Sequence, residues 1–167
     1  MDSICKYDSP IGELSIVSNG TEITEISFCE QRNDSPLNSW SEIQELPVFR
    51  ETKEWLDCYF KGEKPDFTPP IALVGSSFRL DVWQILKGIP YGTTITYGEI
   101  AKELAQKYHI QKMSAQAIGG AVGHNPVSII VPCHRVIGAK GRLTGYTGGL
   151  DKKIFLLKLE QVDLRWE

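Results

Sequence analysis

The hydrophobic pattern changes near residue 76, and this change constrains the fold more than any other feature of the chain. Before it, short segments alternate polar and apolar residues, as half-buried strands do, at residues 3–7, 13–18 and 22–28. After it, apolar residues recur at helical spacing. The pattern predicts an α/β (α+β) fold with two domains, residues 1–75 and 76–167, and 167 residues suffice for two small cores.

The first domain is predicted to be an antiparallel sheet covered by one helix. Turn signals separate the strands at residues 9–12 and at Asn19-Gly20, a dipeptide that strongly favours a hairpin. Residues 30–45 are polar and predict a loop, and the proline-rich residues 61–70 predict a connector. The covering helix is indicated by apolar positions at helical spacing, namely Val48, Phe49, Thr52, Trp55, Leu56 and Tyr59. No motif here carries chemistry, which favours a scaffold over a binding role.

The second domain is predicted to be mostly helical. Ser76 or Ser77 can cap a first helix with Phe78, Val82, Ile85 and Leu86 facing inward. Thr96 and Glu99 form a capping box for a second helix, whose inward face is Ile100, Ala101 and Leu104. Ser114 can cap a third helix over residues 115–122. Two short helices joined by a turn and followed by a strand predict a winged helix-turn-helix domain.

The third predicted helix contains two adjacent glycines, Gly119 and Gly120. Each glycine costs roughly 1 kcal/mol inside a helix, so the pair needs a reason. Small side chains let a helix backbone come very close to another surface. That surface is either a neighbouring helix of the same chain or a separate molecule.

Charge is divided unevenly along the chain. Residues 1–75 hold 6 Lys and Arg against 14 Asp and Glu, a net charge of −8, whereas residues 76–167 hold 12 against 7, a net charge of +5. Only the second half would be attracted to a polyanion such as a nucleic acid. No apolar run is long enough to cross a membrane, and no targeting segment is recognised, so a cytoplasmic location is expected.

The apolar run 127–131 ends in Pro132-Cys133-His134-Arg135. The run predicts a strand that delivers Cys133 to a polar pocket. A thiol is a strong nucleophile only as the thiolate, and a neighbouring base or cation favours that form. Adjacent side chains of a strand point to opposite faces, so His134 would reach the sulfur through a bend or a bridging water. The alternative is a small apolar cysteine that ends a core strand.

The segments around this motif resemble one known family. They are Gly119-Gly120-Ala121-Val122-Gly123-His124-Asn125-Pro126, Val136-Ile137-Gly138 and Gly145-Tyr146-Thr147-Gly148-Gly149-Leu150. In this order and spacing they resemble the O6-alkylguanine-DNA alkyltransferases, or methylated-DNA–protein-cysteine methyltransferases. The resemblance extends from about Ser77 to Glu160, roughly half of the chain. It implies that the second domain carries the active-site cysteine.

The resemblance also implies roles for the catalytic candidates Cys133, His134, Glu160, Asn125 and Tyr97. Cys133 would accept the alkyl group, while Glu160 would hold His134, which polarises a water against the thiol. Asn125 would tie the helix-turn-helix to the cysteine segment, and Tyr97 would donate a proton toward N3 of guanine. From the residues alone, Glu160 lies on an apolar helix over residues 151–161, which favours a buried carboxylate over a surface one.

The resemblance places the third helix in the DNA minor groove, and the base pocket beside it. The residues expected to contact DNA or the base are Gln116, Ala117, Gly119, Gly120, Arg135, Tyr146, Thr147 and Gly148. Arg135 would make structural hydrogen bonds or assist the thiolate. Gln116 departs from the family pattern, because many members have at this position an arginine that fills the gap left by the flipped base.

The implied function is direct repair of O6-alkylguanine in double-stranded DNA by a monomer, with O4-alkylthymine as a further candidate lesion. The alkyl group would move irreversibly to Cys133, once per molecule, with no cofactor and no metal. A base inside the duplex must be flipped out to reach the thiol. Two alternatives stay open on the residues: a non-catalytic module that binds alkylated bases, and a Cys-His-Glu hydrolase.

Overall fold

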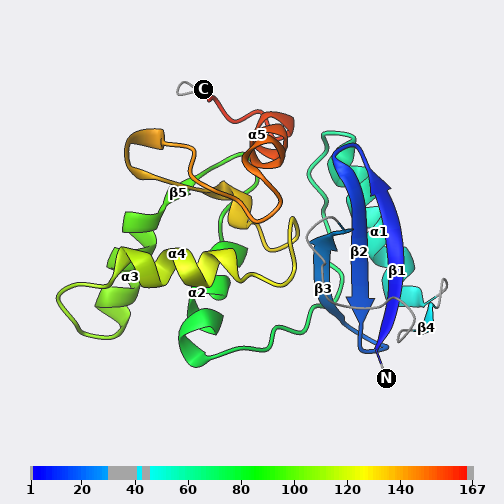
Figure 1. Cartoon of the computed structure of the whole chain (residues 1–167), viewed down its shortest axis with the longest axis horizontal. Helices are drawn as coiled ribbons and strands as arrows, with labels where there is room; N and C mark the ends of the chain where they lie inside the picture. Colours follow the sequence, from blue (N-terminus) through cyan, green and yellow to red (C-terminus); the bar gives the residue numbers. More distant parts are fainter. Residues whose placement is uncertain (1, 30–40, 43–45, 165–167) are drawn as a thin grey trace. The chain divides into compact units, whose positions relative to one another are not determined.

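The computed structural model describes residues 2–29, 41–42 and 46–164 (Figure 1). The chain divides into two compact units, residues 1–73 with 126–128, and residues 74–125 with 129–167. The expected boundary after residue 75 lies two positions from this division. The three residues 126–128 belong to the first unit, although the sequence pattern assigns them to the second domain.

The sheet of the first unit has the strand order β3-β2-β1-β4. The antiparallel strands β1 (Ser3–Ser9), β2 (Gly12–Ser18) and β3 (Ile23–Phe28) confirm the three predicted strands. Most of the predicted 30–45 loop lies outside the described residues, but Ser41–Glu42 form a short strand, β4, that pairs in parallel with β1. The sheet is therefore antiparallel with one parallel edge.

Helix α1 (Pro47–Phe60) packs on this sheet, and its six buried residues are the six that the spacing predicts. The turns also follow the sequence signals. Gly12 and Gly20 both adopt positive φ values, 120° and 113°, which glycine reaches without a steric cost. Asn19 caps its own turn, since its side-chain oxygen accepts the backbone N–H groups of Thr21 and Glu22.

The second unit contains α2 (Ser77–Lys87), α3 (Tyr97–Lys107), α4 (Ala115–Gly123) and α5 (Leu150–Leu159). Its short strands β5 (Ile95–Thr96) and β6 (Val136–Ile137) pair in parallel. The three predicted caps are confirmed, because Ser76, Thr96 and Ser114 each accept a backbone N–H three residues ahead.

The helices α2, α3 and α4 pack against one another (Figure 1). On α2, Val82 and Leu86 are buried as predicted, Phe78 and Ile85 are half-buried, and Trp83 supplies the largest buried side chain. The Trp83 indole N–H donates to the carbonyl of Ala121, 2.8 Å away. This bond fixes α4 against α2 inside the core.

The prediction of a strand over residues 127–131 is wrong. Val127 makes an isolated bridge to Ile26, residues 128–130 form a turn, and Ile129 has φ of +73°. Pro126 has no N–H for a ladder, and the Asn125 side chain donates to the carbonyl of Val131, 2.8 Å away, which closes the segment into a loop. Turn chemistry at the ends thus overrides the β propensity of the run.

Candidate active site

A cavity of about 590 Å³ opens in the second unit, between the start of α3, one face of α4 along its whole length, the residue Cys133 and the loop at residues 144–147. It is lined by Tyr97, Ala115, Gln116, Gly119, Val122, Gly123, Cys133, Thr144, Gly145, Tyr146 and Thr147. Six of these were predicted as site residues, namely Tyr97, Gln116, Gly119, Cys133, Tyr146 and Thr147. Segments up to 50 positions apart therefore meet around one thiol.

The other predicted site residues do not line the cavity, and they are Ala117, Gly120, Asn125, His134, Arg135, Gly148 and Glu160. Five lining residues were not predicted, namely Ala115, Val122, Gly123, Thr144 and Gly145. Three of these five, Val122, Gly123 and Gly145, lie inside the segments that carry the family resemblance. The resemblance could therefore have identified them as site residues.

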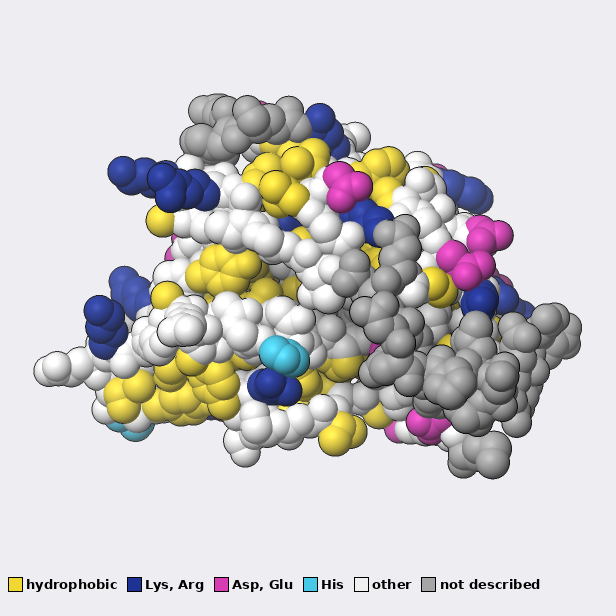
Figure 2. Space-filling view, in the orientation of Figure 1, with side chains coloured by type: hydrophobic (Ala, Val, Ile, Leu, Met, Phe, Trp, Pro, Cys, Tyr) yellow, Lys and Arg dark blue, Asp and Glu magenta, His cyan; other side chains and the backbone are white. Residues whose placement is uncertain are grey.

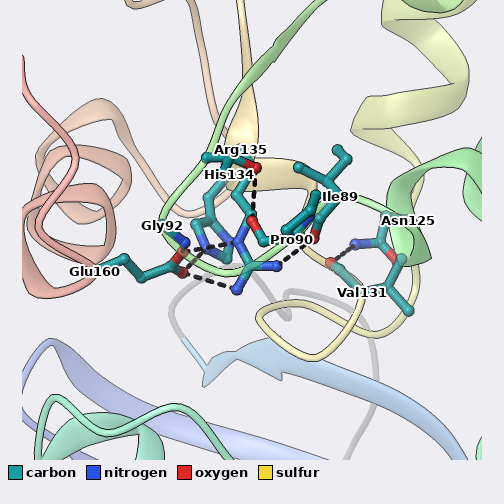
Figure 3. A network of polar contacts seen from close by, with 9 residues as sticks. Ile89, Pro90, Gly92, Asn125, Val131, His134, Arg135 and Glu160 are labelled. Atoms are coloured by element: carbon teal, nitrogen blue, oxygen red, sulfur yellow. Dashed lines mark hydrogen bonds and ion pairs between the residues drawn. The ribbon is translucent and has the colours of Figure 1, made fainter.

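Cys133 begins a 3-10 turn, Cys133–Arg135, instead of ending a strand. With three residues per turn, successive side chains point about 120° apart. Cys133 is 6% exposed and lines the cavity, whereas His134 is 0% exposed and turns into the interior (Figure 3). The turn supplies the bend that the adjacent Cys-His pair requires.

The interior side of this turn holds an ion-pair network (Figure 3). Glu160, the residue directly after α5, accepts from His134 Nε2 at 2.7 Å. It also accepts from Arg135 Nε at 2.8 Å and Nη2 at 3.1 Å, and from the Gly92 N–H at 2.9 Å. The buried carboxylate expected at Glu160 is confirmed, since it is 3% exposed, although the last residue inside α5 is Leu159.

Arg135 contributes to this network and not to the cavity. Its Nη1 donates to the carbonyl of Ile89 at 2.8 Å, and its guanidinium lies 5.6 Å from the centre of the Tyr91 ring. The sequence leaves two roles open for Arg135, structural hydrogen bonds or assistance to the thiolate. The structure contains the structural hydrogen bonds. It is not placed to contact a base bound in the cavity.

The network decides which protons the side chains carry. Burial alone raises the pKa of Glu160, but the hydrogen bonds and charges of His134 and Arg135 outweigh it and lower that pKa to about 2. Burial lowers the pKa of His134 despite its carboxylate partner. Near pH 7 an ionised Glu160 can only accept, so the proton of a neutral His134 lies on Nε2, which leaves Nδ1 the basic nitrogen.

The thiol itself lies in a mixed environment. Burial raises the pKa of Cys133 above its ordinary value, and a hydrogen bond from the Asn125 side chain and the positive charge of Lys153 offset only part of this increase. Asn125 also holds the carbonyl of Val131, two residues before the cysteine. The predicted linking position of Asn125, between α4 and the cysteine segment, therefore corresponds to a pair of contacts in the structure.

The loop over the cavity is attached at both ends. The Thr144 hydroxyl donates to the Tyr97 hydroxyl, 3.3 Å away, and the Thr147 hydroxyl donates to the carbonyl of Gly123, 3.1 Å away. These bonds connect the loop to the first turn of α3 and the last turn of α4. The loop, α3 and α4 are thus joined by hydrogen bonds around the cavity.

The glycines of α4 face open space. A Cβ atom added at Gly119, Gly120 or Gly123 would meet no described atom within 4 Å, apart from its chain neighbours and the nearby backbone of its own helix. Close packing against a neighbouring helix of the described chain therefore does not explain them.

The charged side chains on the left of Figure 2, over the second unit, are mostly Lys and Arg.

The described residues offer neither a metal site nor a membrane span. No three His, Cys, Asp or Glu side chains among them are grouped so as to hold a metal ion. Within the same part of the chain, no helix is both long and apolar enough to span a membrane.

Comparison with known proteins gives the family to which this fold and site belong. Residues 77–162 match the model of the 6-O-methylguanine DNA methyltransferase, DNA binding domain, and residues 5–73 match that of its ribonuclease-like domain. The chain belongs to the 6-O-methylguanine DNA methyltransferase family.

Individual relatives cover nearly the whole chain. A methylated-DNA–protein-cysteine methyltransferase of Haemophilus influenzae is 43% identical over 93% of this chain and 84% of its own length. A methylated-DNA–protein-cysteine methyltransferase of Methanosarcina acetivorans is 44% identical over 92% of this chain and 95% of its own length. Among solved structures, Mycobacterium tuberculosis OGT in complex with DNA is similar with a TM-score of 0.82 and 41% identity, covering 95% of this chain and 93% of that one.

Proposed function

We propose that this protein repairs O6-alkylguanine in double-stranded DNA by transferring the alkyl group to its own Cys133. The observation that carries the proposal is the joint placement of Cys133 in a cavity and of a buried His134–Glu160 pair directly behind it. The relatives named for this reaction, and the related structure in complex with DNA, support it.

The first step is formation of the thiolate. Cys133 gives its proton, through a bridging water, to Nδ1 of His134, and Glu160 stabilises the resulting imidazolium through its bond to Nε2. Asn125 and the charge of Lys153 favour the thiolate. Because Glu160 is ionised and anchored by Arg135 and Gly92, it needs no rearrangement to play this part.

The second step is displacement. The sulfur forms a bond to the alkyl carbon as the carbon–O6 bond breaks, and the electron pair of that bond passes to the guanine. Tyr97 donates its hydroxyl proton toward N3, so the base leaves neutral. The proton that His134 took from the thiol then passes through solvent to the Tyr97 oxygen, which restores both side chains to their neutral forms. The product is a thioether on Cys133, which leaves no thiol for a second cycle.

DNA must deliver the base to this cavity. We infer that α4 enters the minor groove through Gln116, Ala117, Gly119 and Gly120, which agrees with the open space over its glycines. The flipped base would lie against Tyr146, Thr147 and Gly148. Gln116 lines the cavity, which supports the proposal that its side chain occupies the stack that the base leaves.

Intact-protein and peptide mass measurements after incubation with duplex O6-methylguanine DNA test this function. We expect one methyl group per molecule, on the Cys133 peptide, and Cys133→Ala should bind DNA without accepting it. A hydrolase would turn over repeatedly without an adduct, and a non-catalytic module would bind without one. Methylation of Cys5, Cys29 or Cys58 in place of Cys133 would also contradict the proposal.

We also propose the cytoplasm as the location of this activity, because a free thiol such as Cys133 is maintained in a reducing compartment.

A further inference from the structure

Lys153 is a buried charge next to the site whose position calls for an explanation. It lies in the first half of α5, its side chain is 0% exposed, and it is among the largest fully buried side chains of the described chain. Lysines are almost never fully buried unless they are paired. Burial lowers the pKa of its ammonium to about 8. Such a residue is expected to have specific partners.

The partners are three backbone carbonyls that belong to two parts of the site. Lys153 Nζ donates to Val136 at 2.6 Å, to Thr144 at 3.2 Å and to Gly145 at 3.5 Å. Val136 directly follows the Cys133–Arg135 turn, whereas Thr144 and Gly145 line the cavity. The three N–H groups of one ammonium thus join the turn that carries the thiol to the wall of the cavity.

This wall also contacts Tyr97 of α3, the group expected to protonate the leaving base. The Thr144 side chain donates to the Tyr97 hydroxyl, while the Thr144 backbone is held by Lys153. A displacement of residues 144–145 would therefore change both the shape of the cavity and the position of the Tyr97 hydroxyl.

Lys153 also acts on the thiol through its charge. Its positive charge lowers the pKa of Cys133, and a Cys133 thiolate raises the pKa of Lys153 in return. Behind the turn lie the ionisable groups His134, Arg135 and Glu160, and the guanidinium of Arg135 is directed to Glu160. On the cavity side, the ionisable groups that line the same cavity as Cys133 are Tyr97 and Tyr146. In a buried site such an interaction is only weakly screened by solvent.

We propose that Lys153 is a positioning residue of the alkyl-transfer site, which holds the 144–145 wall against the Cys133 turn and stabilises Cys133 as the thiolate. This inference rests on the proposed role of Cys133 as the alkyl acceptor. When Cys133 becomes a thioether, the ammonium loses its anionic neighbour and keeps only the three carbonyls.

Two substitutions separate the hydrogen bonds from the charge. Lys153→Gln keeps amide N–H donors for the carbonyls but removes the charge, and Lys153→Met removes both. The control is Lys158→Gln, which neutralises an exposed lysine of the same helix. The first readout is the rate at which iodoacetamide modifies Cys133, followed on its peptide across pH. The second is single-turnover reaction with the free base O6-benzylguanine, which separates its dissociation constant from the maximal rate.

We expect both Lys153 variants to need a higher pH for Cys133 modification, by about one unit, which is about a tenfold loss of thiolate below that pH. The dissociation constant for O6-benzylguanine should rise in Lys153→Met and stay near the parent value in Lys153→Gln. The control should match the parent in both readouts. If the rate of Cys133 modification by iodoacetamide depends on pH in Lys153→Gln as it does in the parent, the proposal is overturned.

The iodoacetamide readout contains no guanine, so it tests Lys153 even if Cys133 accepts no alkyl group from DNA. Failure of the parent protein to become methylated would instead overturn the proposed function. If neither variant folds, the unsubstituted protein decides the question by carbon-13 NMR of its lysine side chains. The pKa of Lys153 should fall after Cys133 is benzylated, and an unchanged pKa overturns the proposal.

Discussion

The Nε2 atom of His134 and the Oε2 atom of Glu160 lie 2.7 Å apart although 26 positions separate the two residues in the chain. Both side chains are buried, and Arg135, the next residue of the turn, donates hydrogen bonds to the same carboxylate. The pair is therefore fixed in advance of any reaction. Its geometry makes Glu160 a permanent acceptor and His134 Nδ1 the basic nitrogen.

We predict that Glu160→Gln slows alkyl transfer without abolishing DNA binding. The amide cannot stabilise a His134 imidazolium as a carboxylate does, and assistance by a general base typically contributes ~10²–10⁴-fold. Single-turnover rates on duplex O6-methylguanine DNA measure the loss, and Glu103→Gln, an exposed carboxylate on α3, is the matched control. A folded Glu160→Gln protein that reacts at the parent rate would show that the relay does not operate.

The same carboxylate should control acid stability. Its folded-state pKa is about 2, below the ordinary value of 4.5. The stabilisation is therefore complete above pH 4.5 and disappears as the pH falls toward 2, with a magnitude on the order of 3 kcal/mol. Urea unfolding from pH 7 to pH 2 should show the parent losing its advantage over Glu160→Gln across this window. A constant difference between the two proteins would contradict the assigned ionisation.

Gln116 offers a test of base flipping. If it fills the stack, Gln116→Ala should react more slowly with duplex O6-methylguanine but at the parent rate with free O6-benzylguanine, since only the duplex has a stack to open. Gln116→Arg should recover or exceed the parent rate on duplex. Gln106→Ala on α3 serves as an exposed control outside the cavity. Equal losses on both substrates would mean that Gln116 supports the cavity, and no loss on either would assign the filling to another residue.

A substitution at Gly120 tests the contribution of α4 to stability separately from its contact with DNA. Apart from its chain neighbours and the nearby backbone of its own helix, a methyl group there meets no described atom within 4 Å, so Gly120→Ala should raise the free energy of unfolding by up to about 1 kcal/mol through helix propensity. Because Gly120 does not line the cavity, reaction with free O6-benzylguanine should be unchanged. Reaction with duplex should slow if the α4 backbone approaches DNA. If Gly120→Ala is more stable and reacts with duplex at the parent rate, the proposal that α4 enters the minor groove is contradicted.

Local signals in the sequence determined the elements. The strand alternation, the six inward residues of α1 and the caps at Ser76, Thr96 and Ser114 depend on contacts within a few residues, so they are readable without tertiary structure. The motif around Cys133 and its resemblance to a family also pointed to the cavity side chains Tyr97, Gln116 and Tyr146.

Tertiary structure decided how these elements present their chemistry. The run 127–131 has the composition of a strand, yet the Asn125–Val131 bond and the pairing with Ile26 make it a loop, and Cys133 begins a turn. The direction of Arg135 toward Glu160, and the capture of three carbonyls by Lys153, join residues that are distant in the chain. The partner that each buried charge finds depends on these long-range neighbours, so no local pattern of residues could predict the contacts of Arg135 and Lys153.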